Sequence, residues 1–331
     1  MSKSASRIVL VTGAAGFVGS HLTDRLLEQG NQVVGIDNFS RGTRNNLDLA
    51  HAEFRFFEGD LSDTSSLRKI FSSFEIDTVW HMVANSDIGA GVADPNVDLR
   101  DTFLSTFNLL VAMREARVGN LAFASTSAIY GVHDRVLEEN IGPLFPISNY
   151  GAMKLASEAL ISAAVESYLK RAWIFRFPNV IGPRATHGII FDLLNKLALN
   201  PPDLEVLGDG TQQKPYLHVS ELIDAMLWIH DHASEPLNWF NIGPPDEGTT
   251  VKDIAEAVRR EAAPSKPIRF TGGNKGWVGD VPKFHYSIEK LRRLGWSPQL
   301  NSSQAVARAV KEIHAEFEKS KESGVRSQKV G

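Results

Sequence analysis

The chain has 331 residues, of which 43% are hydrophobic and 22% are charged, and its formal net charge is −4. This composition is typical of a globular protein with two domains or one large domain, and the negative charge argues against a nucleic-acid or anionic-membrane partner. The absence of cysteine excludes disulfides, thiolate metal sites and cysteine nucleophiles. No apolar segment has the length of a signal core or a membrane span, so we expect a cytoplasmic protein.

The first residues predict a strand, a glycine-rich turn and a helix. Ile8 to Thr12 is a β-branched apolar run, typical of a buried parallel strand, and it stops at Gly13. Gly16 and Gly19 follow, and apolar residues then recur at helical spacing. Such a turn lets backbone N–H groups bind a pyrophosphate at the positive end of a helix. A purely structural turn is the alternative for a glycine motif on its own.

The second predicted strand, Gln32 to Asp37, ends in an acidic residue. A carboxylate at this position accepts hydrogen bonds from the adenosine ribose and repels a 2′-phosphate, so Asp37 favours NAD over NADP. We interpret the nearby Arg41 and Arg44 as solvated loop charges.

Further buried strands are expected over residues 54–57, 78–84, 120–124 and 173–177, with a long helix that starts at Pro95. Asp60 has two interpretations, an acceptor for the adenine amino group or the cap of a helix near Thr64. His81 is interpreted as a core histidine, and no metal-ligand spacing surrounds it. Ser125 and the residue after it end the fifth strand, where ligands of doubly wound sheets bind.

Tyr150 and Lys154 are spaced i,i+4, so a helix places both on one face. A lysine ammonium held near a tyrosine stabilises the phenolate and lowers the pKa of the phenol, which makes the pair a proton-transfer unit. Asn149 is the expected cap of this helix. The helix is apolar on several faces, which predicts a homodimer through helices near residues 95–117 and 149–170.

The alternation of strands and helices predicts a Rossmann-type doubly wound parallel α/β sheet with a smaller mixed α/β domain. We expect the first domain over residues 1–180, with 216–243 packing back onto it. The second domain is expected over 181–215 and 244–318, followed by a frayed tail over 319–331.

These motifs resemble the extended short-chain dehydrogenase/reductase family and, within it, the UDP-glucose 4-epimerases of the shorter archaeal type. The resemblance covers nearly the whole chain. It includes residues 12–22, 37–40, 59–61, 125–131, 176–184, 187–190, 207–212, 219–221 and 279–281, together with the tyrosine–lysine pair.

The resemblance implies a role for each matching residue. Tyr150 is the expected base, Lys154 binds the nicotinamide ribose, and Thr126 is the substrate-side hydroxyl. The expected NAD-binding residues are Gly13, Gly16, Phe17, Val18, Gly19, Asp37, Asn38, Ser40, Gly42, Asp60, Leu61, Val83, Ala84, Ser125, Tyr150, Lys154, Phe177 and Val180. The residues expected to bind a UDP-sugar are Ser125, Thr126, Asn179, Ile190, Leu207, Lys214, Asp280 and Phe284, and no metal is expected.

The two residues after the catalytic hydroxyl discriminate between reactions. Related 4,6-dehydratases carry an acid pair there because elimination needs an extra acid and base, whereas this chain has Ser127 and Ala128. The pair therefore favours epimerisation. The chain departs from the family pattern at four positions, where Thr102 replaces asparagine, Ser86 and Trp277 replace basic residues, and Lys214-Pro215 replaces an arginine–aspartate pair.

We expect an NAD-dependent epimerase that interconverts UDP-glucose and UDP-galactose through a 4-keto sugar. Phe284 lies where epimerases that refuse N-acetyl sugars carry a bulky tyrosine, although an ordinary core phenylalanine fits equally well. The alternatives are an epimerase of UDP-glucuronate or another nucleotide sugar, a nucleotide-sugar reductase, and, more distantly, a non-catalytic NAD-binding regulator.

Overall fold

The computed structural model describes residues 7–273 and 286–322. The chain forms two compact units, each assembled from separate stretches of sequence. The first unit comprises Met1–Pro178, Ile223–Ile242 and Ser287–Ser297, and the second comprises Asn179–Leu222, Gly243–Tyr286 and Pro298–Gly331.

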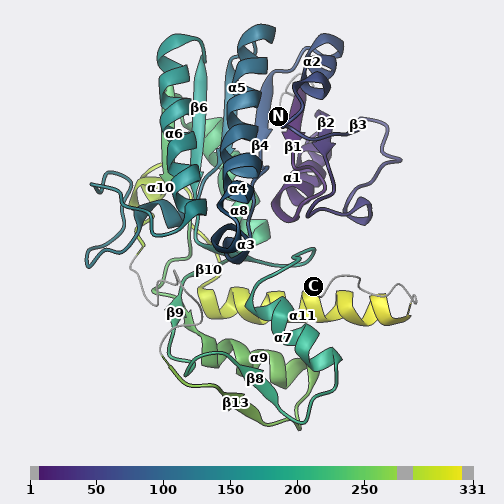
Figure 1. The fold of residues 1–331 in the computed structure, drawn as a ribbon, viewed down its shortest axis with the longest axis vertical. Helices are drawn as coiled ribbons and strands as arrows, with labels where there is room; N and C mark the ends of the chain where they lie inside the picture. Colours follow the sequence, from purple (N-terminus) through teal and green to yellow (C-terminus); the bar gives the residue numbers. More distant parts are fainter. Residues whose placement is uncertain (1–6, 274–285, 323–331) are drawn as a thin grey trace. The chain divides into compact units, whose positions relative to one another are not determined.

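The first unit is built on a seven-stranded sheet with the order β3-β2-β1-β4-β5-β6-β11, in which every neighbouring pair is parallel (Figure 1). Four of its strands are buried except for their first residue, and the strand over Thr78–His81 is buried throughout, as their continuous apolar runs predict. The fold class is therefore confirmed. The strands are β1 (Ile8–Thr12), β2 (Gln32–Asp37), β3 (Phe54–Glu58), β4 (Thr78–His81), β5 (Asn120–Ala124), β6 (Arg171–Arg176) and β11 (Leu237–Asn241).

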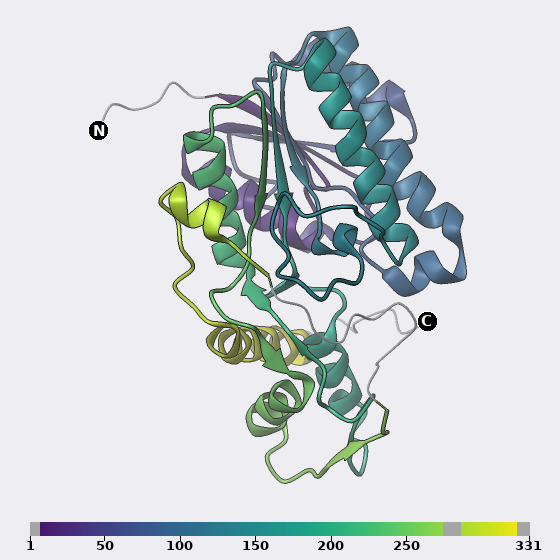
Figure 2. The same ribbon diagram turned by 90° about the vertical axis from the view of Figure 1, so that its left-hand side faces the viewer.

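Helices cover both faces of this sheet (Figure 2). On one face, α1 (Phe17–Glu28) is joined to α8 (Val219–His232) by an ion pair between Arg25 and Asp224 at 2.5 Å. The other face carries α2 (Thr64–Ser73), α5 (Ser105–Ala116) and α6 (Asn149–Ser167), whose apolar residues form one core with the sheet. The shorter elements are η1 (Arg44–Asn46), α3 (Ile88–Ala93), α4 (Pro95–Asp98), η2 (Leu99–Leu104), η3 (Ser127–Tyr130) and α10 (Glu289–Arg293).

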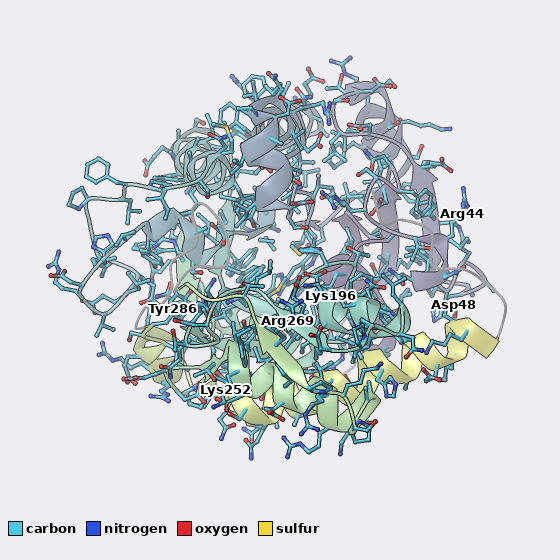
Figure 3. The ribbon with its side chains drawn as sticks, turned by 60° about the horizontal axis from the view of Figure 1, so that its bottom comes forward. Arg44, Asp48, Lys196, Lys252, Arg269 and Tyr286 are labelled. Atoms are coloured by element: carbon cyan, nitrogen blue, oxygen red, sulfur yellow. The ribbon has the colours of Figure 1, made fainter. Side chains whose placement is uncertain are left out.

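In its described residues, the second unit combines three two-stranded sheets with three helices around a core of its own. β7 (Asn179–Ile181) pairs with β10 (Tyr216–His218), β8 (Leu204–Val206) with β13 (Ile268–Phe270), and β9 (Gln213–Lys214) with β12 (Thr249–Thr250). The helices are α7 (Ile189–Ala198), α9 (Val251–Ala262) and α11 (Ser302–Glu322). Around β8, Arg269 bridges Asp203 and Glu205, and Lys196 donates to the Glu205 carbonyl oxygen (Figure 3).

Three details differ from the sequence-based expectations. The helix expected from Pro95 is divided into α4, the π-helical η2 and α5. The predicted cap Asn149 is wrong, because the Ser148 hydroxyl accepts from the Gly151 N–H while Asn149 donates to the Gly91 carbonyl oxygen. Residues 216–222 lie in the second unit and 287–297 in the first, whereas the sequence analysis placed these two stretches the other way round.

Candidate active site

The glycine-rich loop lies where the strand order reverses, between β1 and β4. Gly13 has a φ of 71°, and a Cβ at this position would lie 3.1 Å from the backbone nitrogen of Val83. A Cβ on Gly19 would overlap the Gly13 carbonyl oxygen, so α1 packs this closely only because residue 19 is glycine. α1 starts after Gly16 without a side-chain cap or an acidic first turn. Its first N–H groups therefore fit a pyrophosphate.

Asp37 ends β2 and is only 6% exposed. Its two carboxylate oxygens accept from the Ala15 and Phe39 N–H groups at 3.0 and 2.8 Å. Burial raises the pKa of Asp37, and the backbone N–H groups oppose that rise. A fixed acceptor beside the glycine loop fits the hydroxyls of a ribose.

The two arginines after β2 are held by acidic partners. Arg41 pairs with Asp87 at 3.0 Å, and Arg44 pairs with Glu58 at 2.5 Å. The Arg44 guanidinium also lies 4.8 Å from the centroid of the Phe39 ring, at the rim of the first unit (Figure 3). These contacts agree with their interpretation as loop charges.

Asp60 does not cap α2, because Asp63 accepts from the Ser65 N–H at that position. One Asp60 oxygen accepts from the Asn38 side chain at 2.6 Å and the other from the Ser62 N–H at 2.7 Å. These hydrogen bonds and the Arg100 charge lower the pKa of Asp60 despite its partial burial. Asp60 therefore remains an ionised acceptor behind β3.

The proton-transfer residues meet at the carboxyl end of β5. Thr126 is 8% exposed, and its hydroxyl accepts from the Ala128 N–H at 3.1 Å. It also lies near enough to the Tyr150 phenol to lower the pKa of that group. A Cβ on Gly151 would lie 2.6 Å from the Ala128 carbonyl oxygen, so the first turn of α6 is in close contact with η3. Gly151 therefore allows Thr126 and Tyr150 to come close together, a role that was not predicted for this glycine.

Lys154 is 1% exposed and donates from Nζ to the Ala124 carbonyl oxygen at 2.5 Å. Burial lowers its pKa to about 7, and the Glu158 charge opposes that fall. Burial raises the pKa of Tyr150 to about 12, the Thr126 hydrogen bond lowers it, and the Asp98 charge raises it. The lowering of the Tyr150 pKa expected from Lys154 is thus not found in the chain by itself, where burial, Thr126 and Asp98 determine the shift.

A buried polar network behind this pair escaped the sequence analysis. Ser125 donates to Glu158 at 2.5 Å, and Arg176 binds both oxygens of Glu158. Arg176 also donates to the Tyr130 hydroxyl at 3.1 Å, and Tyr130 donates to Asn241 at 2.7 Å. The available signal was the position of Glu158, one helical turn after Lys154.

His81 is fully buried between two threonines. Its Nε2 lies 3.0 Å from the Thr106 hydroxyl, which itself donates to the Thr102 carbonyl oxygen. Nε2 must therefore carry the proton, and Nδ1 accepts from the Thr12 hydroxyl at 2.7 Å. The interpretation of His81 as a satisfied core histidine is confirmed.

The expected NAD-binding residues of the first unit gather at one edge of the sheet, where the strands end at their carboxyl termini. They lie after β1 (Gly13, Gly16, Phe17, Val18, Gly19), β2 (Asp37, Asn38, Ser40, Gly42), β3 (Asp60, Leu61), β4 (Val83, Ala84), β5 (Ser125) and β6 (Phe177), and on α6 (Tyr150, Lys154). Val180 lies on β7 of the second unit.

The expected substrate residues of the second unit differ in accessibility. Ile190 is 2% exposed and packs in the core of this unit, so its side chain presents little surface to a ligand, and its role in substrate binding stays a prediction. Leu207 is 53% exposed after β8, Lys214 is half-buried in β9, and the Asn179 amide donates to the Pro215 carbonyl oxygen at 3.4 Å. Asp280, Phe284 and Trp277 lie outside the described residues.

Neither a metal-binding group nor a membrane-spanning helix is found within residues 7–273 and 286–322. In these ranges, no group of three or more histidine, aspartate or glutamate side chains is placed to hold a metal ion. The same ranges contain no helix with both the length and the apolar character needed to cross a membrane.

Comparison with known proteins places this geometry in a family. Residues 9–243 match the model of the NAD dependent epimerase/dehydratase family. The UDP-glucose 4-epimerase of Halalkalibacterium halodurans is 31% identical and aligns over 93% of this chain and 96% of its own length. Two crystal structures align over 94% and 93% of this chain and 99% of theirs. They are a Thermotoga maritima UDP-glucose 4-epimerase with UDP-glucose (28% identity, TM-score 0.83) and a Thermus thermophilus UDP-glucose 4-epimerase with NAD (29%, 0.82).

The glycine loop, the uncapped start of α1 and Asp37 fit the cofactor that this family uses, and the expectation of NAD is confirmed. The match spans most of the chain. The chain belongs to the NAD dependent epimerase/dehydratase family.

Proposed function

We propose that this protein interconverts UDP-glucose and UDP-galactose by oxidising the sugar at C4 and reducing it again on the opposite face. The chain is an NAD-dependent UDP-sugar 4-epimerase, and the proposal adds the identity of the sugar. The support for this reaction within the chain is the approach of Thr126 to Tyr150 at the carboxyl end of β5, with Ser127 and Ala128 where a dehydratase needs acids. The similarity to UDP-glucose 4-epimerases supports the choice of sugar.

The residues of the chain hold and move one proton in this reaction. When bound, NAD supplies the hydride acceptor for C4, returns the hydride, and brings a positively charged ring that favours a phenolate. Tyr150 Oη takes the proton from the sugar 4-hydroxyl as C4 loses its hydride. Thr126 accepts from the Ala128 N–H, so its own proton is free to donate toward Tyr150.

The buried Lys154 supplies positive charge one helical turn from Tyr150. Because burial raises the pKa of Tyr150 to about 12, the tyrosine needs such charge to ionise near neutral pH. The 4-keto sugar then turns while its UDP stays bound, the opposite face receives the hydride, and Tyr150 returns the proton to the new 4-hydroxyl. No net oxidation results, so added NAD is not consumed.

A panel of UDP-sugars tests the proposal. Purified protein is incubated with UDP-glucose, UDP-galactose, UDP-N-acetylglucosamine or UDP-glucuronate, and the products are separated chromatographically. We expect UDP-glucose and UDP-galactose to reach one common equilibrium mixture without accumulation of NADH. Faster turnover of UDP-glucuronate or of the N-acetyl sugar would move the assignment to that sugar, and stoichiometric NADH would indicate a dehydrogenase.

Tyr150→Phe tests the assigned base. Removal of the phenolic oxygen should lower kcat by at least about 10³-fold, because the variant loses the group that takes the proton. The buried remainder of the ring should keep the fold and NAD binding, which a thermal shift with NAD measures. Turnover close to that of the unsubstituted protein would refute the role of Tyr150.

A further inference from the structure

A buried ion pair beside Lys154 has no part in the mechanism above. Glu158 and Arg176 are only 6% and 7% exposed. The Arg176 Nη2 and Nε atoms lie 2.6 and 3.1 Å from the two Glu158 carboxylate oxygens, which is a forked arrangement. Because a guanidinium keeps its charge in proteins, the fork holds Glu158 as a carboxylate.

Glu158 and Lys154 hold two consecutive residues at the end of β5. Lys154 donates to the Ala124 carbonyl oxygen, and the Ser125 hydroxyl donates to Glu158, both at 2.5 Å. The two α6 residues are spaced i,i+4 and therefore lie on the same helix face. One helix face thus fixes the strand end that carries the catalytic hydroxyl.

The direction of the Ser125 hydrogen bond follows from chemistry. A carboxylate has no proton to donate, so Ser125 must be the donor to Glu158. Its single proton is then engaged, and only the lone pairs of its oxygen remain for another partner. A ligand group that binds Ser125 must therefore be an N–H or O–H donor.

We propose that Glu158 is a positioning residue, which keeps Lys154 cationic one turn from Tyr150 and holds Ser125 as a hydrogen-bond acceptor for the ligand. The proposal rests on the proposed epimerase function for its catalytic consequence. The effect of Glu158 on the charge of Lys154 does not depend on that function.

The groups around Lys154 leave Glu158 as the source of negative charge. On β4, His81 is uncharged, because burial and the Lys154 charge lower its pKa to about 3. On β5, the Phe123 ring centroid lies 4.5 Å from Nζ, and on β6 the Arg176 charge is paired with Glu158. On α6 itself, Tyr150 and Glu158 flank Lys154 by one turn each. Burial lowers the pKa of Lys154 to about 7 and Glu158 raises it, so loss of that charge should lower the pKa further.

The pH dependence of turnover tests this with Glu158→Gln. Lys154 loses its positive charge as the pH rises through its pKa. In a plot of kcat against pH, the fall of kcat at high pH (the alkaline limb) should therefore move to lower pH in the variant. A fall of about one pKa unit gives about a tenfold loss of kcat on that limb, with recovery at lower pH. Glu158→Asp, which keeps the charge, should restore the limb.

Glu139→Gln is the matched control. Glu139 is also buried and accepts from the Asn241 N–H, and its carbonyl oxygen accepts from Arg176. Its charge does not act on Lys154, whose pKa responds to burial and Glu158. This variant should keep the alkaline limb in place even if its stability falls. Alkaline limbs at the same pH in Glu158→Gln and Glu139→Gln would overturn the proposal.

A measurement without activity separates this proposal from the proposed function. The pH dependence of the free energy of unfolding reports the protons bound on unfolding. At about pH 6, Lys154 of the unsubstituted protein is mostly charged in both states, whereas in Glu158→Gln, with a pKa lower by about one unit, about half of it should be neutral when folded. The variant should therefore bind roughly 0.4 of a proton more on unfolding, while His81 contributes equally to both proteins. Equal proton uptake overturns the proposal, whether or not the protein turns over any sugar.

Discussion

Thr126 makes two contacts that need a hydroxyl at this position. Its oxygen accepts from the Ala128 N–H, which fixes the side chain, and the hydroxyl lies near Tyr150 and lowers the pKa of that phenol. Thr126→Ala removes both contacts and should lower kcat by about 10²-fold, with a smaller effect on NAD binding. Thr126→Ser keeps the hydroxyl and should restore most of the activity.

Ser127→Ala provides the matched control for this prediction. The Ser127 backbone N–H donates to the Phe177 carbonyl oxygen at 3.0 Å, a contact that alanine retains. Its turnover should therefore stay close to that of the unsubstituted protein. If Ser127→Ala lost as much activity as Thr126→Ala, the assignment of the working hydroxyl would be wrong.

At the residue scale, a site residue could be predicted where its position within one strand or helix determines its role. Contacts between side chains from distant parts of the chain could not be predicted. Asp37 ends an apolar run, so its place beside the glycine loop could be expected. The bond between Ser125 and Glu158 joins residues from different elements, and no spacing rule predicts it. The rise in the pKa of Tyr150 was also missed, because it depends on burial rather than on the lysine four residues later.

At the scale of elements, the first turn of α6 determines where Tyr150 lies. A Cβ on Gly151 would come within 2.6 Å of the Ala128 carbonyl oxygen, so Gly151→Ala must displace α6 from η3. Intrinsic helix propensity favours alanine over glycine by about 1 kcal/mol, but the displacement should separate Tyr150 from Thr126. We expect kcat to fall by about 10²-fold, the scale of a misplacement of about 1 Å.

Ala159→Gly tests whether helix propensity alone explains such a result. Ala159 is exposed on the same helix, so this change should cost about 1 kcal/mol of unfolding free energy and leave kcat unchanged. Denaturant unfolding and steady-state kinetics measure both quantities for each variant. Normal kcat in Gly151→Ala would show that the close contact does not position Tyr150.

Element boundaries were predictable where the chain carries a strong local signal. β1 and β2 span Ile8–Thr12 and Gln32–Asp37 as expected, and Pro95 does open a helix. The division of the following helix at η2 was not predicted, because its residues have no breaker. In the structure, the Thr102 hydroxyl in this stretch accepts from the Asn85 N–H after β4, and Asp98 just before it accepts from the Asn85 side chain. Tertiary hydrogen bonds of this kind leave no periodic trace in the sequence.

At the scale of the whole molecule, self-association remains a prediction, and its surface can now be stated from the first unit. Leu99, Leu104 and Phe107 lie on η2 and α5 and are 40%, 39% and 46% exposed. Exposed apolar side chains on neighbouring helical turns are typical of an interaction surface. A second copy of the chain is the partner that we expect on these helices and on α6.

Phe107→Glu tests this surface by sedimentation velocity. A carboxylate in an apolar interface loses hydration without gaining a partner, so the dimer dissociation constant should rise by at least about 10²-fold and the variant should sediment as a monomer. Val132→Glu adds the same charge at a 68% exposed valine that is not part of η2, α5 or α6 and should leave the mass unchanged. A monomeric unsubstituted protein, or equal dissociation of both variants, would contradict a dimer through α5 and α6. A Phe107→Glu monomer that keeps full turnover would show further that each subunit carries a complete site.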